Sequence, residues 1–216
     1  MGVVIEVSGP YALFSRPELK VERVSYDIIT PSAARGLLES VYWHPGVRWK
    51  IDKIHVMNPI RFVNIRRNEI SAKLSAANAL IAMKGSNTPL YISAQAAIQQ
   101  RASLLLRDVR YVIEAHFDVT ANAAPDDSTD KFYAIIMRRL QKGQCFLQPY
   151  LGCREFPADV CAVKQPIGKA AYEGERDLGF MLYDMDYANP EDIKPRFFRA
   201  VLRDGVLNLS GVEVFQ

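Results

Sequence analysis

Apolar and polar residues alternate most regularly between residues 108 and 120. The odd-numbered positions from 109 to 119 are all apolar, whereas the even-numbered positions from 108 to 120 are polar except at Val112. Successive side chains of a strand point to opposite faces, so the pattern predicts a half-buried strand here. A shorter alternation over residues 3–8 predicts another strand, which we expect to end at Gly9-Pro10.

Two segments show the spacing of helices with one buried face. The first is predicted to begin at Thr30-Pro31, where a hydroxyl can cap the helix and proline suits its first turn, and to end before His44-Pro45-Gly46. The second is predicted to begin after Ser128 and to end at Gly143. Their apolar stripes are Ala34, Leu37, Leu38 and Val41 in the first helix, and Phe132, Ile135, Ile136 and Leu140 in the second.

The other segments complete the expected order of elements. Residues 47–65 are predicted to form one or two strands, residues 69–90 a long insertion or loop, and residues 146–163 further short strands. The resulting order of strand, helix, strand, strand, helix, strand is typical of ferredoxin-like (RRM-like) domains. We therefore expect an α+β fold, with a ferredoxin-like domain over residues 1–164 and a small antiparallel β appendage over residues 165–216, where alternation resumes before a turn at Asp204-Gly205.

Composition excludes several classes of protein. The 216 residues are 49% apolar and contain no apolar run of 18 residues, which argues against a disordered chain and a membrane-spanning helix. No basic segment precedes a long apolar stretch near the first residue, so we expect a cytoplasmic protein. The three cysteines form no C-x-x-C pair and lie apart from the three histidines, so we expect neither a metal site nor another cofactor.

Positive charge is concentrated in one part of the chain. Between Arg48 and Arg110 there are eleven Lys or Arg and three Asp or Glu, a formal charge of +8. The net charge of the whole chain is +3, so the remainder carries −5. A basic block in an otherwise acidic chain indicates a polyanionic partner, and the excess of arginine over lysine favours phosphate. A solvated charged face without a partner is the alternative at this stage.

Three sets of residues could carry chemistry, since the sequence has no phosphate-binding glycine loop, serine-nucleophile elbow or zinc-peptidase motif. His116 lies on the polar face of the best strand and could transfer protons, or it could be an ordinary surface histidine. Tyr42 ends the first helix, where it could equally be a packing residue. Arg66-Arg67 could bind phosphate or be ordinary surface residues. A basic groove with these groups suits RNA cleavage, because RNA supplies its own nucleophile, the 2′-hydroxyl.

Four long blocks of the sequence resemble the CRISPR-associated Cas-five proteins of variant d, from the type I-C system and the RAMP superfamily. They are YALFSRPELKVERVSYDIITPSAARGLLESVYWHPGVRW (11–49), IRRNEI (65–70), LRDVRYVIEAHFDV (106–119) and YLGCREFPA (150–158). The resemblance implies a ferredoxin-like domain with a small β domain. It also implies a metal-independent endoribonuclease that cuts precursor CRISPR RNA at the repeat hairpin, leaving a 2′,3′-cyclic phosphate, and then stays on the 5′ handle in the interference complex.

The resemblance also assigns residues. The family's catalytic tyrosine matches Tyr42, and its strand histidine, followed by phenylalanine, matches His116. Cleaving members can have a lysine before that histidine, where this chain has Ala115, so either another cation substitutes or the site works as a dyad. The alternative is a non-catalytic RNA-binding scaffold subunit, with non-specific binding of duplex DNA. The expected partners are precursor and mature guide RNA and other subunits of the complex, and the expected RNA contacts are Arg48, Lys50, Arg66, Arg67 and Arg110.

Overall fold

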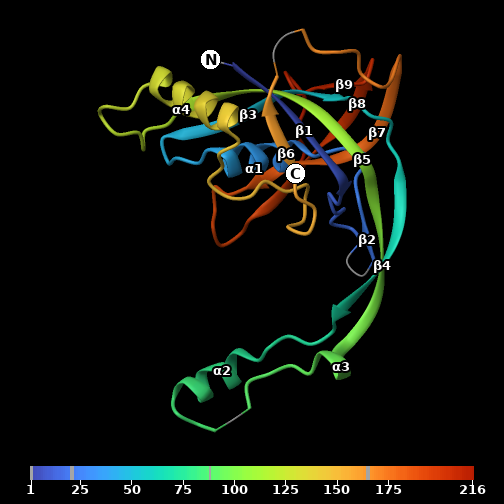
Figure 1. The fold of residues 1–216 in the computed structure, drawn as a ribbon, viewed down its shortest axis with the longest axis vertical. Coiled ribbons are helices and arrows are strands. Elements are labelled where there is room, and N and C mark those ends of the chain that lie inside the picture. The colour runs from blue at the N-terminus through green and yellow to red at the C-terminus, as the bar shows by residue number, and fades with distance from the viewer. Residues whose placement is uncertain (1, 20–21, 88, 164–165) are drawn as a thin grey trace.

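The computed structural model describes residues 2–19, 22–87, 89–163 and 166–216, and its fold is α+β. Within these residues a nine-stranded sheet contains strands in the order β6-β1-β5-β3-β9-β8-β7, with β2 and β4 paired to β5 off this path. Apart from the β2–β5 pair, which is parallel, the paired strands are antiparallel. Figure 1 shows β5 (Ile98–Val119) as a long curved strand that runs from the sheet out to a separate tip.

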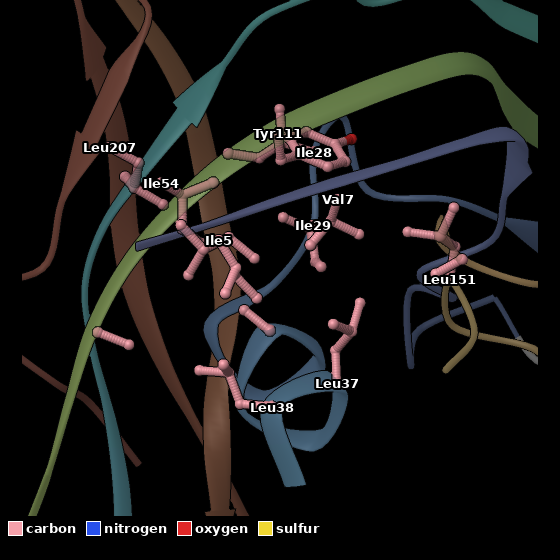
Figure 2. Packing of buried hydrophobic residues seen from close by; sticks show 14 of the residues in the cluster. Ile5, Val7, Ile28, Ile29, Leu37, Leu38, Ile54, Tyr111, Leu151 and Leu207 are labelled. Atoms are coloured by element: carbon pink, nitrogen blue, oxygen red, sulfur yellow. The ribbon is translucent and has the colours of Figure 1, made fainter. Parts of the chain in front are cut away.

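Two helices cover one face of the sheet at the strands β6, β1, β5 and β3. β1 (Gly2–Ala12) lies between β5 and β6 (Asp159–Ala162), and β5 lies between β1 and β3 (Val47–Val56). The alternation predicted for residues 109–119 is confirmed as far as residue 117, because Val109, Tyr111, Ile113, Ala115 and Phe117 are all buried, whereas Val119 is 41% exposed. They form the inner face, which packs with β1 and with α1 (Pro31–Val41), as Figure 2 shows around Ile5, Leu38 and Ile54.

Both predicted helices are confirmed together with their caps. The Thr30 hydroxyl accepts a hydrogen bond from the Ala33 N–H at 3.2 Å, and Pro31 opens α1. The Ser128 hydroxyl likewise accepts from the Lys131 N–H at the start of α4 (Thr129–Lys142), which ends at Gly143 in a left-handed conformation. Such caps satisfy backbone groups that a helix leaves unpaired, which explains why local sequence sufficed to place these helices.

An extended arm departs from what the sequence predicted. β4 (Phe62–Ile70) pairs with the first part of β5, and α2 (Ala76–Met83) and α3 (Ala94–Ala97) lie at its far end (Figure 1). The predicted insertion at residues 69–90 is therefore partly wrong, and the strand predicted from 108 begins ten residues earlier. Asp108 has a positive φ of 56° within this strand, and β5 pairs with β1 in the same register on either side of it.

The C-terminal segment continues the same sheet. β7 (Glu175–Asp186) pairs with β8 (Lys194–Arg203), β8 with β9 (Val206–Asn208), and β9 with β3. The turn predicted at Asp204-Gly205 is confirmed, since both residues have positive φ between β8 and β9. The predicted domain boundary between residues 164 and 165 lies outside the described residues.

Two smaller predictions need correction, and one further short strand completes the sheet. β1 continues through Gly9-Pro10 to Ala12, and β2 (Arg23–Val24) is a short strand beside β5. Of the short strands predicted over 146–163, the described residues contain only β6. No helix in the described part of the chain is long and apolar enough to cross a membrane.

Candidate nucleic-acid interface and proton-transfer site

His116 lies on the face of the sheet opposite the helices, which we call the outer face. Its neighbours along β5, Ala115 and Phe117, are buried in the core, so the imidazole between them points the other way. His116 is paired with Gly2 on β1 and with Lys50 on β3. Gly2 therefore places no side chain beside the imidazole.

A β-bulge brings Asp52 to this histidine. The register between β3 and β5 shifts between Ile51 and Lys53, which leaves Asp52 as the extra residue. Both carboxylate oxygens of Asp52 lie near the His116 Nδ1, at 2.8 and 2.9 Å. The Leu209 N–H donates to the Asp52 carbonyl at 2.9 Å, so the bulge is also tied to the chain beyond β9. An ionised carboxylate only accepts hydrogen bonds, so Nδ1 carries the proton and Nε2 is free to accept one.

The surrounding outer face is a network of ion pairs. Lys50 contacts Asp118 at 2.7 Å, and this hydrogen bond holds the pKa of the Asp118 carboxyl below its ordinary value. Two positions further along β5, Glu114 contacts His55 at 2.7 Å and Lys53 at 3.5 Å. These side chains are partly exposed, as are those of His116 (38%) and Asp52 (35%), so a ligand could reach and exchange with them.

Tyr42 lies in the helical layer at the end of α1. Its residue is 6% exposed, and its ring lies against Phe132 and parallel to His44, with the Arg139 guanidinium 5.1 Å from the ring centre. Burial raises the pKa of the Tyr42 hydroxyl. The group therefore stays protonated near neutral pH, which suits a hydrogen-bond donor better than a base.

The structure does not bring Tyr42 and His116 together. The Tyr42 carbonyl accepts from Trp49 Nε1 at 3.2 Å, and the rings of Trp49 and Phe117 pack on the inner face. The imidazole of His116 projects from the outer face, so the sheet lies between the two candidate catalytic groups. Sequence alternation predicted which way His116 points, but it could not reveal which face the end of α1 covers.

The five expected RNA contacts differ in their surroundings. Lys50, Arg67 and Arg110 form ion pairs with Asp118, Glu155 and Glu6, respectively. Arg48 and Arg66 form no salt bridge within the described residues, and both are exposed. Arg48 lies on β3 opposite Asp118, close to the His116 site, whereas Arg66 lies on the arm opposite Ala102. The predicted contacts therefore do not form a single cluster.

Sequence reasoning placed Glu114 on the polar face with His116 but missed three other residues of the outer face: Asp52, Lys53 and His55. A regular strand would place Asp52 and His55 on opposite faces, so only the bulge explains how both accompany His116 and Glu114. No signal in the sequence marks that bulge. In the described part of the chain, no group of three or more His, Cys, Asp or Glu side chains is arranged to hold a metal ion, and the three cysteines are free.

Comparison with known proteins identifies close relatives. A family model for Cas5d, described as CRISPR-associated protein (Cas_Cas5), matches residues 2–209. A "CRISPR pre-crRNA endoribonuclease Cas5d" of Mannheimia succiniciproducens is 47% identical and is aligned over 95% of this chain and 93% of its own. A protein of the same name from Thermus thermophilus is 38% identical, over 95% and 90%.

Solved structures share the fold at lower identity. A structure titled "Crystal Structure of CRISPR-associated Protein" has a TM-score of 0.71 and 24% identity, covering 100% of this chain and 97% of its own. A chain of a "CRISPR RNA-guided surveillance complex" has a TM-score of 0.55 and 14% identity, covering 96% and 90%. At these identities the structural matches establish the fold alone.

Proposed function

This chain belongs to the Cas5d family of CRISPR-associated proteins, and from this premise we propose that it is an endoribonuclease that cleaves precursor CRISPR RNA in its repeats. Its two curated relatives are named for that activity and align with it over nine-tenths of their length. The structural observation that carries the proposal is the His116–Asp52 pair on an open face rich in cationic side chains.

The proposed reaction uses the 2′-hydroxyl of RNA as the nucleophile. His116 Nε2 takes the proton of that hydroxyl while Asp52 stabilises the imidazolium through Nδ1–H. The 2′-oxygen then bonds to the adjacent phosphorus, and the bond from phosphorus to the 5′-oxygen breaks. The leaving oxygen takes up a proton, from the imidazolium or through water, so the products are a 2′,3′-cyclic phosphate and a 5′-hydroxyl. The chain, its RNA and solvent water supply every group that these steps need, which is the basis for proposing that the reaction needs no metal.

Tyr42 remains a proposed catalytic residue, but the geometry restricts what it can contact. Tyr42 lies in the helical layer and the His116 imidazole projects from the outer face, so we propose that the two residues contact different parts of the RNA. β3 begins at Val47 and β5 ends at Val119, so RNA passing over this end of the sheet would meet the two residues in succession. We therefore assign the scissile phosphate to His116, and to Tyr42 a hydrogen bond that orients neighbouring RNA.

Binding of the RNA backbone would rest on the cations of the outer face and the arm. Arg48 and Arg66 are exposed and in no ion pair within the described residues, so they can meet phosphates without first losing a partner. Lys50, Arg67 and Arg110 would have to exchange or share a carboxylate. We propose that the cleaved RNA stays bound and that the protein joins other CRISPR subunits, as a chain of similar fold does in a surveillance complex.

The strand arrangement supports the finer description of the fold. β1 and β3 are joined through α1 and flank β5, and β5 and β6 are joined through α4 and flank β1. This interleaving is that of a split βαβ unit, so we infer a ferredoxin-like domain followed by a small β domain.

The second candidate function is a non-catalytic RNA-binding subunit that also binds duplex DNA without sequence preference. The observation that favours it is Ala115, which is 1% exposed and lies on the inner face. No lysine adjacent to His116 supplies a cation, and Lys50 across the strand pair is held by Asp118. Placing a lysine at position 115 would bury its ammonium group in the core. This candidate predicts tight RNA binding without cleavage.

The deciding experiment is a cleavage assay on the repeat RNA that accompanies this protein, in excess EDTA. A matched RNA carries one 2′-deoxy sugar immediately 5′ of the cut. Cleavage in EDTA that is lost with the deoxy sugar, and that yields a cyclic phosphate end, is the expected result. Cleavage of the deoxy RNA would overturn the 2′-hydroxyl mechanism, and a requirement for metal would overturn the metal-independent one. Binding without cleavage would favour the scaffold.

A further inference from the structure

A hollow of about 510 Å³ lies on the outer face between β3 and β8, over the short strand β9. Phe198, Ala200 and Leu202 of β8 are buried, so the side chains of Arg199, Val201 and Arg203 between them project from the outer face like His116. The polar side chains that line the hollow are those of Lys53, His55, Arg199, Arg203, Asn208 and Ser210.

No acidic residue is among the residues that line the hollow. The cations do have acidic partners outside the lining: Glu114 for Lys53 and His55, Asp177 for Arg199, and Glu175 for Arg203. The local charge is therefore close to balanced, so net charge alone does not define a ligand. The Arg199 and Arg203 side chains are 67% and 79% exposed, and ion pairs at such exposure contribute little and exchange readily.

What defines the ligand is the excess of hydrogen-bond donors. Arg199 uses Nε and Nη2 on Asp177, which leaves Nη1, and Arg203 uses only Nε on Glu175. The Asn208 Oδ1 accepts from the Ser210 N–H, which leaves the amide NH₂ as the free end of that side chain. A hollow whose lining offers free donors and no carboxylate suits a ligand rich in acceptors, and guanidinium groups match phosphate oxygens particularly well.

The hollow adjoins the proton-transfer site. Lys53 directly follows Asp52, the extra residue of the bulge. His55 lies two residues after Lys53 on β3, and it contacts Glu114, which lies two residues before His116 on β5. Two residues of a strand span about 7 Å, so the near edge of the hollow is a short step from His116. A chain with phosphates at regular intervals would meet both places in one pass across the sheet.

We propose that this hollow is a subsite that binds a backbone phosphate of the RNA, close along the chain to the phosphate that His116 cleaves. The inference rests on the proposed function, because that function supplies the polyanion. Arg199 and Arg203 hold the non-bridging oxygens, with the Asn208 amide as an additional donor. The subsite fixes the direction and register of the RNA across His116, and so contributes to which bond is cut.

The test compares two double variants of the full chain that each lose two cations of β8. Arg199→Ala/Arg203→Ala removes cations from the hollow, whereas Lys194→Ala/Arg196→Ala removes two cations that also form surface ion pairs but do not line it. Binding is measured with the repeat RNA carrying the 2′-deoxy sugar, which cannot be cleaved. We expect the dissociation constant to rise at least tenfold for the first variant and less than threefold for the second.

A second set of RNAs locates the phosphate. Each contains one neutral methylphosphonate within a few nucleotides of the cut. At one position, the methylphosphonate should weaken RNA binding by the unmodified protein and by Lys194→Ala/Arg196→Ala. At the same position it should leave RNA binding by Arg199→Ala/Arg203→Ala unchanged. For Arg199→Ala/Arg203→Ala, the slope of log K against log salt concentration should also become shallower by about one unit. That change is expected for the loss of one phosphate contact.

The outcomes separate the two proposals. If the unmodified protein neither binds nor cleaves repeat RNA, the proposed function fails. If it cleaves RNA and the two double variants bind alike, or if no methylphosphonate distinguishes them, the phosphate subsite is wrong. Loss of binding to a protein subunit by Arg199→Ala/Arg203→Ala, with RNA binding intact, would overturn the RNA assignment and indicate an acidic protein surface instead.

Discussion

At the scale of single residues, the proposed chemistry depends on one hydrogen bond between a strand and a bulge. Asp52 fixes the His116 tautomer that leaves Nε2 free to accept a proton. We expect His116→Gln to lower the single-turnover cleavage rate by about 10²–10⁴-fold, the usual contribution of general acid–base catalysis. The dissociation constant for the deoxy RNA should stay within about threefold.

Asp52→Asn should lower the same rate by a smaller factor, because it disturbs the tautomer without removing the imidazole. Since Asp52 acts through His116, adding Asp52→Asn to His116→Gln should cause no further loss. Nitrogen chemical shifts of the His116 ring should change from the Nδ1–H form toward a mixture of tautomers in Asp52→Asn. An additive loss in the double variant, or an unchanged tautomer, would contradict this positioning role.

Tyr42 should behave differently from His116. Tyr42→Phe keeps the ring that packs against Phe132 and removes only a hydroxyl whose pKa is raised by burial. A protonated hydroxyl that orients RNA should affect binding and rate by similar modest factors, about tenfold or less for one hydrogen bond. Thermal unfolding serves as the control for packing and should be unchanged. A rate loss as large as that of His116→Gln, with binding intact, would place the scissile phosphate at Tyr42 instead.

At the scale of elements, the segment before β6 contains a glycine at a position that disfavours any side chain. Gly152 has a φ of 84°, and a Cβ there would collide with the Leu13 carbonyl just beyond β1. We expect Gly152→Ala to destabilise the protein by roughly 2 kcal/mol or more, measured by urea unfolding, since it combines backbone strain with a steric clash. Gly174→Ala is the matched control. Its φ of 71° is similar but its surroundings are open, so it should cost about 1 kcal/mol. Equal losses would show that the close approach to Leu13 is unimportant.

Elements that depend on local signals were predictable from sequence, and those that depend on distant contacts were not. α1 and α4 carry their own caps and apolar stripes, so their limits were found within a residue or two. The first part of β5 was missed because its partner, β4, lies on an exposed arm where few positions are buried and alternation is weak. The bulge at Asp52 was missed because it arises from the register of β3 against β5 and leaves no mark in composition.

At the scale of the whole molecule, the basic block between Arg48 and Arg110 is partly neutralised by residues outside it. Glu6, Glu114, Asp118 and Glu155 pair with cations of the block across long stretches of sequence. A window of sequence cannot reveal such pairs. The charge pattern therefore predicted a polyanionic partner but not which cations would be available to it.

This difference leads to a prediction about affinity. Arg110→Ala/Glu6→Ala removes an exposed ion pair without changing net charge, whereas Arg48→Ala/Arg66→Ala removes two exposed cations that form no salt bridge within the described residues. If free cations carry the backbone contacts, the first variant should bind the deoxy RNA within about twofold of the unmodified protein. The second should bind the deoxy RNA at least tenfold more weakly at about 0.15 M salt. The slope of log K against log salt concentration should become shallower by about two units for this variant.

Duplex DNA provides the comparison that separates specific contacts from general attraction. Its binding should weaken in Arg48→Ala/Arg66→Ala by a similar factor, because backbone contacts do not depend on sequence. Conversely, a strong loss of RNA binding in Arg110→Ala/Glu6→Ala would mean that RNA displaces Glu6 from Arg110. In that case the ion-pair network of the outer face would itself be the RNA-binding surface, and its carboxylates would set the energetic cost of each phosphate contact.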